Sequence, residues 1–203
     1  MQEGRIRRSN PQRSAEMRAR LVTAAREFFL THGYAAAATP AIVAAAGVTR
    51  GALYHHFDDK RAIFHAVIEA EARAAAAAIT EADDPNLSAA ERLVAGGFAY
   101  LAAMQLPGRA RLMLVDGPAV LGHETIRNIE AGLGEALLRE GLAAALGEGG
   151  SELPVGALAS LLSAMFERAS LDLAQGAVEA EVRSAVQAVV LGLVGTRPHS
   201  AKK

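Results

Sequence analysis

The residues most able to do chemistry gather in one short stretch, GVTRGALYHHFDDK, at positions 47–60. Histidine and carboxylate side chains can bind metals or transfer protons. Adjacent helical residues diverge by about 100°, however, whereas side chains on one face are three or four positions apart. His55 and His56 therefore do not predict a metal pair. Asp58 and Asp59 directly precede a helical pattern and suit capping positions. The stretch predicts a binding surface more readily than a catalytic centre.

The composition removes several classes of site. The chain has 203 residues, of which 51% are hydrophobic, and it contains no cysteine. Disulfides, thiolate nucleophiles and cysteine-based metal sites are therefore excluded. We find no nucleophile motif, phosphate loop or metal-spaced cluster, so we predict a protein that is not an enzyme and needs no cofactor. No signal peptide and no transmembrane run appear, which predicts a cytoplasmic protein without a membrane partner.

The charges are distributed unevenly. Residues 1–61 hold ten Arg and Lys against five Asp and Glu, whereas the remainder holds eleven against seventeen. A basic segment of this kind favours a polyanionic partner. Two interpretations of the arginines that precede the first helix stay open, a disordered arm or a contact with phosphate or a minor groove. These arginines are Arg5, Arg7, Arg8 and Arg13.

Good helix formers dominate the whole chain, and alternating strand patterns are missing. Thr39 and Thr49 suit helix starts, Pro40 suits a first helical position, and Gly47 suits a helix end. We predict an all-α protein of about nine helices with two domains, residues 1–61 and residues 62–203. The expected helices span residues 14–31, 40–46, 50–56, 60–80, 89–104, 110–114, 124–146, 155–175 and 178–193.

The first three of these helices predict a helix-turn-helix, with Gly47-Val48-Thr49 as the turn. Ile42, Val48, Leu53 and Phe57 are spaced to point into a common core. The opposite side of the third helix then presents hydrogen-bond donors and small residues, which is the composition of a recognition helix in the major groove. The residues on that side are Thr49, Arg50, Ala52, Tyr54 and His55.

Residues 18–64 resemble the DNA-binding domain of TetR-type transcriptional repressors. The resemblance rests on ARLVTAAREFFLTHGYAAAAT, AIVAAAGVTRGALYHHF and DDKRAIF. It implies phosphate contacts for Thr39, Tyr54 and Lys60. Two positions depart from the family pattern, Ala38 where a second Thr or Ser is common and Val43 where Ala is common. The full implied DNA-binding set is Thr39, Thr49, Arg50, Gly51, Ala52, Tyr54, His55 and Lys60.

The resemblance also implies a helical C-terminal domain that dimerises and binds a small-molecule inducer. The last two predicted helices carry wide apolar stripes, which favour a homodimer through a four-helix interface. Two recognition helices must then meet half-sites about 34 Å apart, which predicts a palindromic operator on double-stranded DNA. Apolar and isolated polar residues of this domain are candidates for a pocket that takes a largely apolar inducer. They are Phe98, Leu101, Met104, Met113, Asp116, His123, Arg127, Met165, Phe166, Arg168 and Asp172.

Two functions stay open from the sequence. The first is a ligand-responsive transcriptional repressor, released from DNA by the inducer. The second is a DNA-binding activator or architectural protein without a ligand.

The polar candidates for the pocket also have a structural alternative. Asp116 can form a turn, and Arg127 or Arg168 can pair with acids on neighbouring helices.

Overall fold

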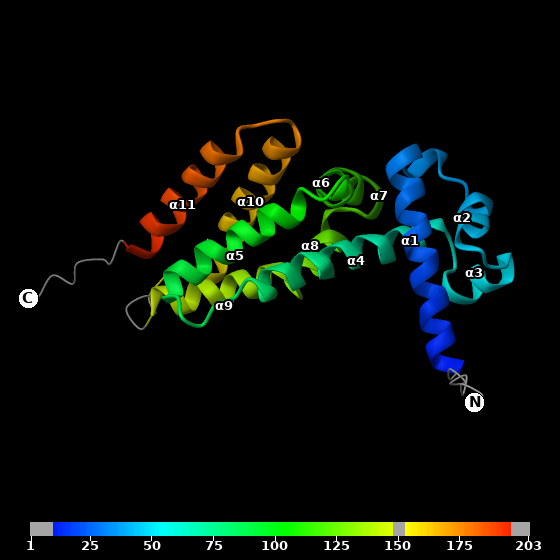
Figure 1. The fold of residues 1–203 in the computed structure, drawn as a ribbon, viewed down its shortest axis with the longest axis horizontal. Coiled ribbons are helices and arrows are strands. Elements are labelled where there is room, and N and C mark those ends of the chain that lie inside the picture. The colour runs from blue at the N-terminus through cyan, green and yellow to red at the C-terminus, as the bar shows by residue number, and fades with distance from the viewer. Residues whose placement is uncertain (1–9, 148–152, 196–203) are drawn as a thin grey trace, which may run out of the picture. The chain divides into compact units, whose positions relative to one another are not determined.

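A computed structural model describes residues 10–147 and 153–195, and all regular structure in these ranges is helical. The chain separates into two compact units, residues 1–70 and 71–203 (Figure 1). One helix, α4 (Lys60–Glu81), begins in the first unit and ends in the second. The predicted all-α architecture is confirmed. The predicted domain boundary after residue 61 falls in the first turn of α4, whereas the two compact units divide between residues 70 and 71.

The first unit contains α1 (Asn10–Ala36), α2 (Thr39–Ala46), α3 (Arg50–His56) and the start of α4. The predicted stop at Gly33 appears as a non-helical residue, with φ 73° and ψ 165°, that separates two helical pieces within α1. Ile42, Leu53 and Phe57 are buried as the sequence predicts. Phe29 and Phe64 complete this core edge to face, with ring centroids 5.0 Å apart.

One predicted cap is wrong. Helix α2 begins at Thr39 itself, so its N-cap residue is Ala38, which has no side-chain acceptor. Pro40 lies in the first turn, where a missing N–H costs no helical hydrogen bond. The other predicted caps are confirmed, because the N–H of Ala52 donates to Thr49 Oγ1 at 3.1 Å and that of Ala62 donates to Asp59 Oδ1 at 2.7 Å.

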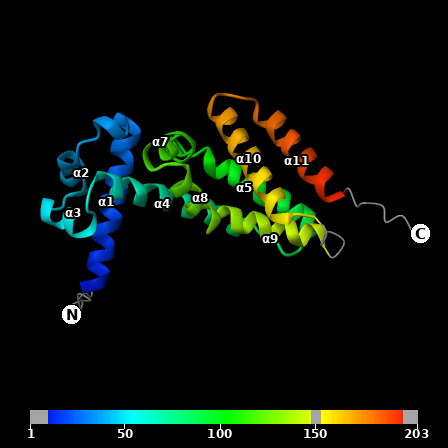
Figure 2. The ribbon, with the colours of Figure 1, turned by 180° about the vertical axis from the view of Figure 1, so that it is seen from behind.

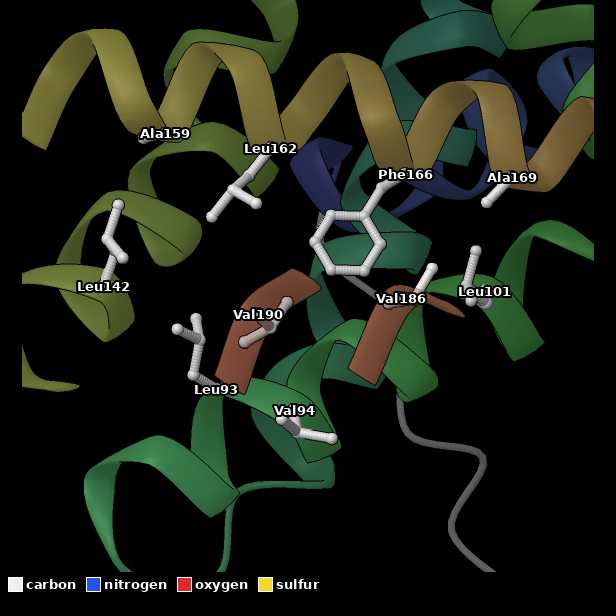
Figure 3. Packing of buried hydrophobic residues seen from close by; sticks show 10 residues of the cluster. All are labelled: Leu93, Val94, Leu101, Leu142, Ala159, Leu162, Phe166, Ala169, Val186 and Val190. Carbon is white, nitrogen blue, oxygen red and sulfur yellow. The ribbon is translucent and has the colours of Figure 1, made fainter. Parts of the chain in front are cut away.

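The second unit holds the end of α4 and the remaining helices. In chain order these are α5 (Ala89–Met104), α6 (Arg109–Arg111), the π-helix η1 (Leu112–Asp116), α7 (Gly117–Leu121), α8 (His123–Ala131), α9 (Gly134–Leu146), α10 (Val155–Ala174) and α11 (Glu179–Gly195). Helices α10 and α11 lie side by side in opposite directions in both views (Figures 1 and 2). Side chains from α5, α9, α10 and α11 point toward one another and form the core (Figure 3).

Two predicted boundaries in this unit are wrong. The chain stays helical from Arg109 to Leu121, through η1 and the Gly117-Pro118 pair that was expected to interrupt it. Pro118 lies in the first turn of α7, where it is tolerated. The expected single helix at 124–146 is divided into α8 and α9 around Leu133, whose φ is −129° and ψ −99°. Gly132 and Gly134 flank this break, and glycine weakens a helix interior by about 1 kcal/mol.

Candidate nucleic-acid interface and ligand cavity

The turn between α2 and α3 is held by a glycine and an arginine. Gly47 adopts left-handed backbone angles, φ 61° and ψ 39°, which only glycine adopts without strain. Arg20 Nη2 donates to the carbonyl of Ala46 at 2.6 Å. A Cβ on residue 47 would lie 2.9 Å from the same Nη2. The arginine therefore holds the end of α2, and a side chain at residue 47 would both strain the left-handed backbone and displace this arginine.

The predicted recognition face is exposed. Tyr54 is 46% exposed, although it lies next to Leu53, which is fully buried. The Arg50 guanidinium lies 5.5 Å from the centre of the Tyr54 ring, so these two side chains form one surface. An added Cβ at Gly51 would meet only Thr49 Oγ1, at 3.9 Å, so the fold does not demand glycine there. Of the α3 candidates, Thr49, Arg50, Gly51, Tyr54 and His55 are exposed and Ala52 is half-buried.

His56 differs from its neighbour His55. Its side chain is half-buried next to Phe57, whose ring lies under the Arg18 guanidinium. Burial, with smaller effects from the charges of His55 and Arg18, lowers the pKa of His56. The neutral imidazole is therefore favoured, and His56 belongs to the packed side of α3.

Lys60 has partners that the sequence did not indicate. Its ammonium donates to the carbonyls of Tyr34 at 2.8 Å, Ala35 at 3.1 Å and Ala37 at 3.2 Å, and it lies 4.5 Å from the centre of the Tyr34 ring. These contacts satisfy carbonyls at the end of α1. A lysine has three donors, so a phosphate contact, which stays a prediction, would compete with these bonds. Thr39 is half-buried, Arg13 is exposed, and Arg5, Arg7 and Arg8 lie outside the described residues.

A cavity of about 380 Å³ lies within the second unit, among α4, α5, α8, α9 and α10, with one wall residue from η1. This volume falls within the range of about 300–1,000 Å³ typical of small-molecule pockets. Most of its wall is apolar and much of it is made of small residues. The apolar and small residues include Ala72, Ala75, Ala76, Ile79, Leu93, Gly96, Gly97, Met113, Leu137, Leu138, Gly141 and Phe166.

Of the predicted ligand residues, Met113 and Phe166 line this cavity. The others lie elsewhere. Leu101 and Met104 are 1% exposed within the core, and Met165 packs against the same core. Phe98 lies under the Arg183 guanidinium, 4.0 Å from the ring centre.

The five polar candidates do not line this cavity, and three of them are held in ion pairs. Arg168 pairs with Asp172 at 2.7 Å, one helical turn away, and Asp116 pairs with Arg111 at 3.2 Å. His123 and Arg127 are exposed on α8. Arg168 therefore pairs with an acid, but on its own helix and not on a neighbouring one as the structural alternative proposed. Within the described ranges, no group of three or more His, Cys, Asp or Glu could hold a metal ion.

The sequence missed the polar groups that do face the cavity. Tyr100, Glu130 and Glu135 line its wall, and Ser163 lies beside them. Burial, and then the charges of Glu167 and Glu135, raises the pKa of Glu130 to about 7. Burial also raises the pKa of Glu167 and, together with nearby carboxylates, that of Tyr100. The cavity is therefore apolar with one acidic region.

Both units of the chain match known protein families. Residues 21–67 match the model for "bacterial regulatory proteins, tetR family", and residues 90–196 match the model for "tetracyclin repressor-like, C-terminal domain". The chain belongs to the TetR family. It is accordingly a DNA-binding transcriptional regulator, and the helix-turn-helix predicted from residues 47–60 lies in the first matched region.

Individual proteins are similar to this chain in sequence or in fold. The HTH-type transcriptional repressor BepR of Brucella suis biovar 1 (strain 1330) is 44% identical over 55 residues, which span 27% of this chain and 26% of BepR. The fatty acid degradation regulator FadR of Bacillus halodurans has a TM-score of 0.71 at 18% identity, covering 87% of this chain and 97% of FadR. LfrR of Mycobacterium smegmatis, in complex with proflavine, has a TM-score of 0.60 at 18% identity, covering 87% of this chain and 94% of LfrR. None of the helices in the described ranges is long and apolar enough to span a membrane.

Proposed function

We propose that this regulator is a ligand-responsive repressor that binds a palindromic operator as a homodimer. In this proposal α3 reads the DNA, and a small molecule in the cavity releases it. Residues 1–61 form the DNA-binding domain, and residues 62–203 bind the ligand and the second protomer. The observation that carries the proposal is the cavity itself, because Ala72, Ala75 and Ile79 of α4 form part of its wall. The same helix begins directly after the recognition segment.

A buried ion pair supports coupling between the cavity and α4. Arg109 Nε donates to Glu71 Oε2 at 2.8 Å, and both side chains are less than a tenth exposed. Arg109 precedes η1, in which Met113 lines the cavity. A ligand that moves η1 therefore acts on α4 through this pair. It shifts the equilibrium between DNA-binding and released forms only by its differential affinity for the two.

The homodimer is supported by exposed apolar side chains on the last two helices. Leu161 of α10 is 70% exposed, and Val189 of α11 is 51% exposed. Apolar residues gathered on one surface mark interaction sites in soluble proteins. A two-fold dimer through α10 and α11 would cover them and provide two recognition helices for two half-sites.

The experiment begins with selection of bound sequences from a random DNA pool. A palindromic consensus supports the proposal, whereas binding without sequence preference favours the architectural alternative. Arg50→Ala is expected to weaken operator binding by about 1–3 kcal/mol and to relax preference at one base pair. Tyr54→Phe is expected to weaken binding equally for all sequences if its hydroxyl contacts phosphate. Arg139→Ala, an exposed arginine of α9, makes the same charge change and serves as the control. Unchanged binding in both test variants would refute the α3 interface.

A further inference from the structure

The cavity has a carboxylate that no described residue neutralises. The carboxylate of Glu130, at the end of α8, lines the cavity, and no hydrogen bond or ion pair joins it to any described residue. Glu135 of α9 lies on the same wall, and Glu167 of α10 stands close enough to act on the Glu130 charge. Glu167 accepts one bond, from Ser163 Oγ at 3.4 Å. Two acidic side chains from two helices therefore line one partly enclosed space, and Glu167 of a third helix lies close to one of them.

The basic residue on the cavity wall does not balance these acids. Arg92 is the only arginine or lysine among the lining residues, and its Nε donates to Asp83 Oδ1 at 2.6 Å. A second bond runs from Nη2 to the other carboxylate oxygen, and both side chains are more than 40% exposed. Bidentate pairing of this kind occupies the guanidinium fork. The acidic region consequently keeps its negative potential at pH values where Glu130 is ionised.

The rest of the wall suits a hydrocarbon or aromatic group. Phe166 and Tyr100 present rings that stand edge to face, with centroids 6.0 Å apart. Leu93, Leu137 and Leu138 extend this apolar side. Aromatic faces also attract cations, which adds to the attraction of the carboxylates.

We infer that the cavity binds an amphipathic organic cation, an amine or quaternary ammonium with an apolar body. The charged group lies beside Glu130, with Glu135 and Glu167 nearby, and the apolar body lies against Phe166 and the leucines. The cation supplies the counter-charge that the protein lacks at this wall. The expectation that the cation changes operator binding rests on the proposed function, whereas the expectation that it binds in the cavity does not.

The test uses three probes that share one alkyl chain and differ in the head group: decyltrimethylammonium, 1-decanol and decanoate. Each is titrated calorimetrically, below its micellar concentration, into the full-length protein without DNA at pH 8. The cation is expected to bind about tenfold to a hundredfold more tightly than the alcohol, because a charge-assisted contact is worth that much. Decanoate is expected to bind most weakly. Equal affinity for cation and alcohol, tighter binding of decanoate, or no binding by any probe overturns the inference.

Two variants separate charge from shape. Glu130→Gln keeps the size of the side chain and should remove the preference for the cation, while binding of the alcohol stays unchanged. Glu124→Gln makes the same change at an exposed position of α8 and should alter neither. In wild-type protein, binding of the cation near pH 7 should release protons, because the cation favours ionised Glu130. A Glu130→Gln protein that keeps the cation preference would contradict the assignment.

The outcome on DNA distinguishes this inference from the proposed function. If the cation binds through Glu130 but leaves operator binding unchanged, the cavity assignment holds and the ligand-responsive role fails. If another class of molecule releases the operator and the cation does not bind, the repressor role holds and the inference fails.

Discussion

Glu130 should make the folding stability of this protein fall as pH rises. Its pKa is raised from an ordinary value of 4.5 to about 7, because burial and the carboxylates of Glu167 and Glu135 disfavour the charged form. Tyr100 faces the same region from α5 and is neutral at these pH values. The folded state then binds more protons than the unfolded state between the two pKa values. Stability from protonated Glu130 is complete below about pH 4.5 and is lost as pH rises through about 7.

The size of this effect follows from the shift. A pKa change of about 2.5 units corresponds to about 3 kcal/mol, at roughly 1.4 kcal/mol for each unit. Glu130→Gln removes the ionisation and keeps the shape of the protonated side chain. The variant should therefore match wild-type stability at pH 4.5 and exceed it by up to about 3 kcal/mol at pH 8.5. The difference between the two proteins isolates this residue from other titrating groups such as Asp83 and Glu91, whose pKa values are lowered.

The measurement is urea unfolding followed by far-ultraviolet circular dichroism across this pH range. Protein concentration is held fixed, since the stability of a dimer depends on it. Glu124→Gln, on the exposed side of the same helix, should give a curve parallel to that of the wild type. A Glu130→Gln curve that is also parallel, or one that lies below the wild type at pH 8.5, would refute the reasoning. Greater stability with weaker cation binding in the same variant is the result expected of a binding group kept at a cost to the fold.

Further variants test individual contacts by urea unfolding. Arg109→Met leaves the Glu71 carboxylate buried without its guanidinium and should cost about 3–5 kcal/mol, whereas adding Glu71→Leu should recover most of the loss. Gly47→Ala should cost about 1–2 kcal/mol, because it forces a left-handed alanine and displaces Arg20, and wild-type stability would contradict the described turn. Leu53→Ala should cost about 2–5 kcal/mol because Leu53 is fully buried, and a loss below about 1 kcal/mol would show that α3 packs differently.

The helix-turn-helix could be predicted from the sequence because its signals are local. Thr49, Gly47 and Asp59 act on backbone groups within a few residues, so their types alone indicate where helices begin and end. Leu53 and Phe57 follow the helical period toward one core. The roles of Arg20 and Lys60 could not be predicted in the same way. Their carbonyl partners lie more than twenty positions away in the sequence.

The irregular helices of the second unit show a second reason why helix boundaries could not all be predicted from the sequence. The π-helix η1 and the break between α8 and α9 depend on packing around them, and glycine or proline alone does not decide the outcome. Gly117-Pro118 lies between two predicted helices and is helical, whereas Gly132 lies inside the helix predicted at 124–146 and stands at a break. The same residue types therefore have opposite effects in two nearby segments.

The cavity could not be located from the sequence because a cavity forms where side chains are small. Bulky residues such as Leu101 and Met104 attract attention as lining candidates, yet their volume is what fills the core. Oppositely charged residues one turn apart, such as Arg168 and Asp172, satisfy each other and have no need of a ligand. The informative pattern is a set of small residues on two helices, close to an acidic residue that has no basic partner. Gly97 illustrates it, because a Cβ there would lie 2.5 Å from Phe166 and the ring needs that space to stand at the cavity wall.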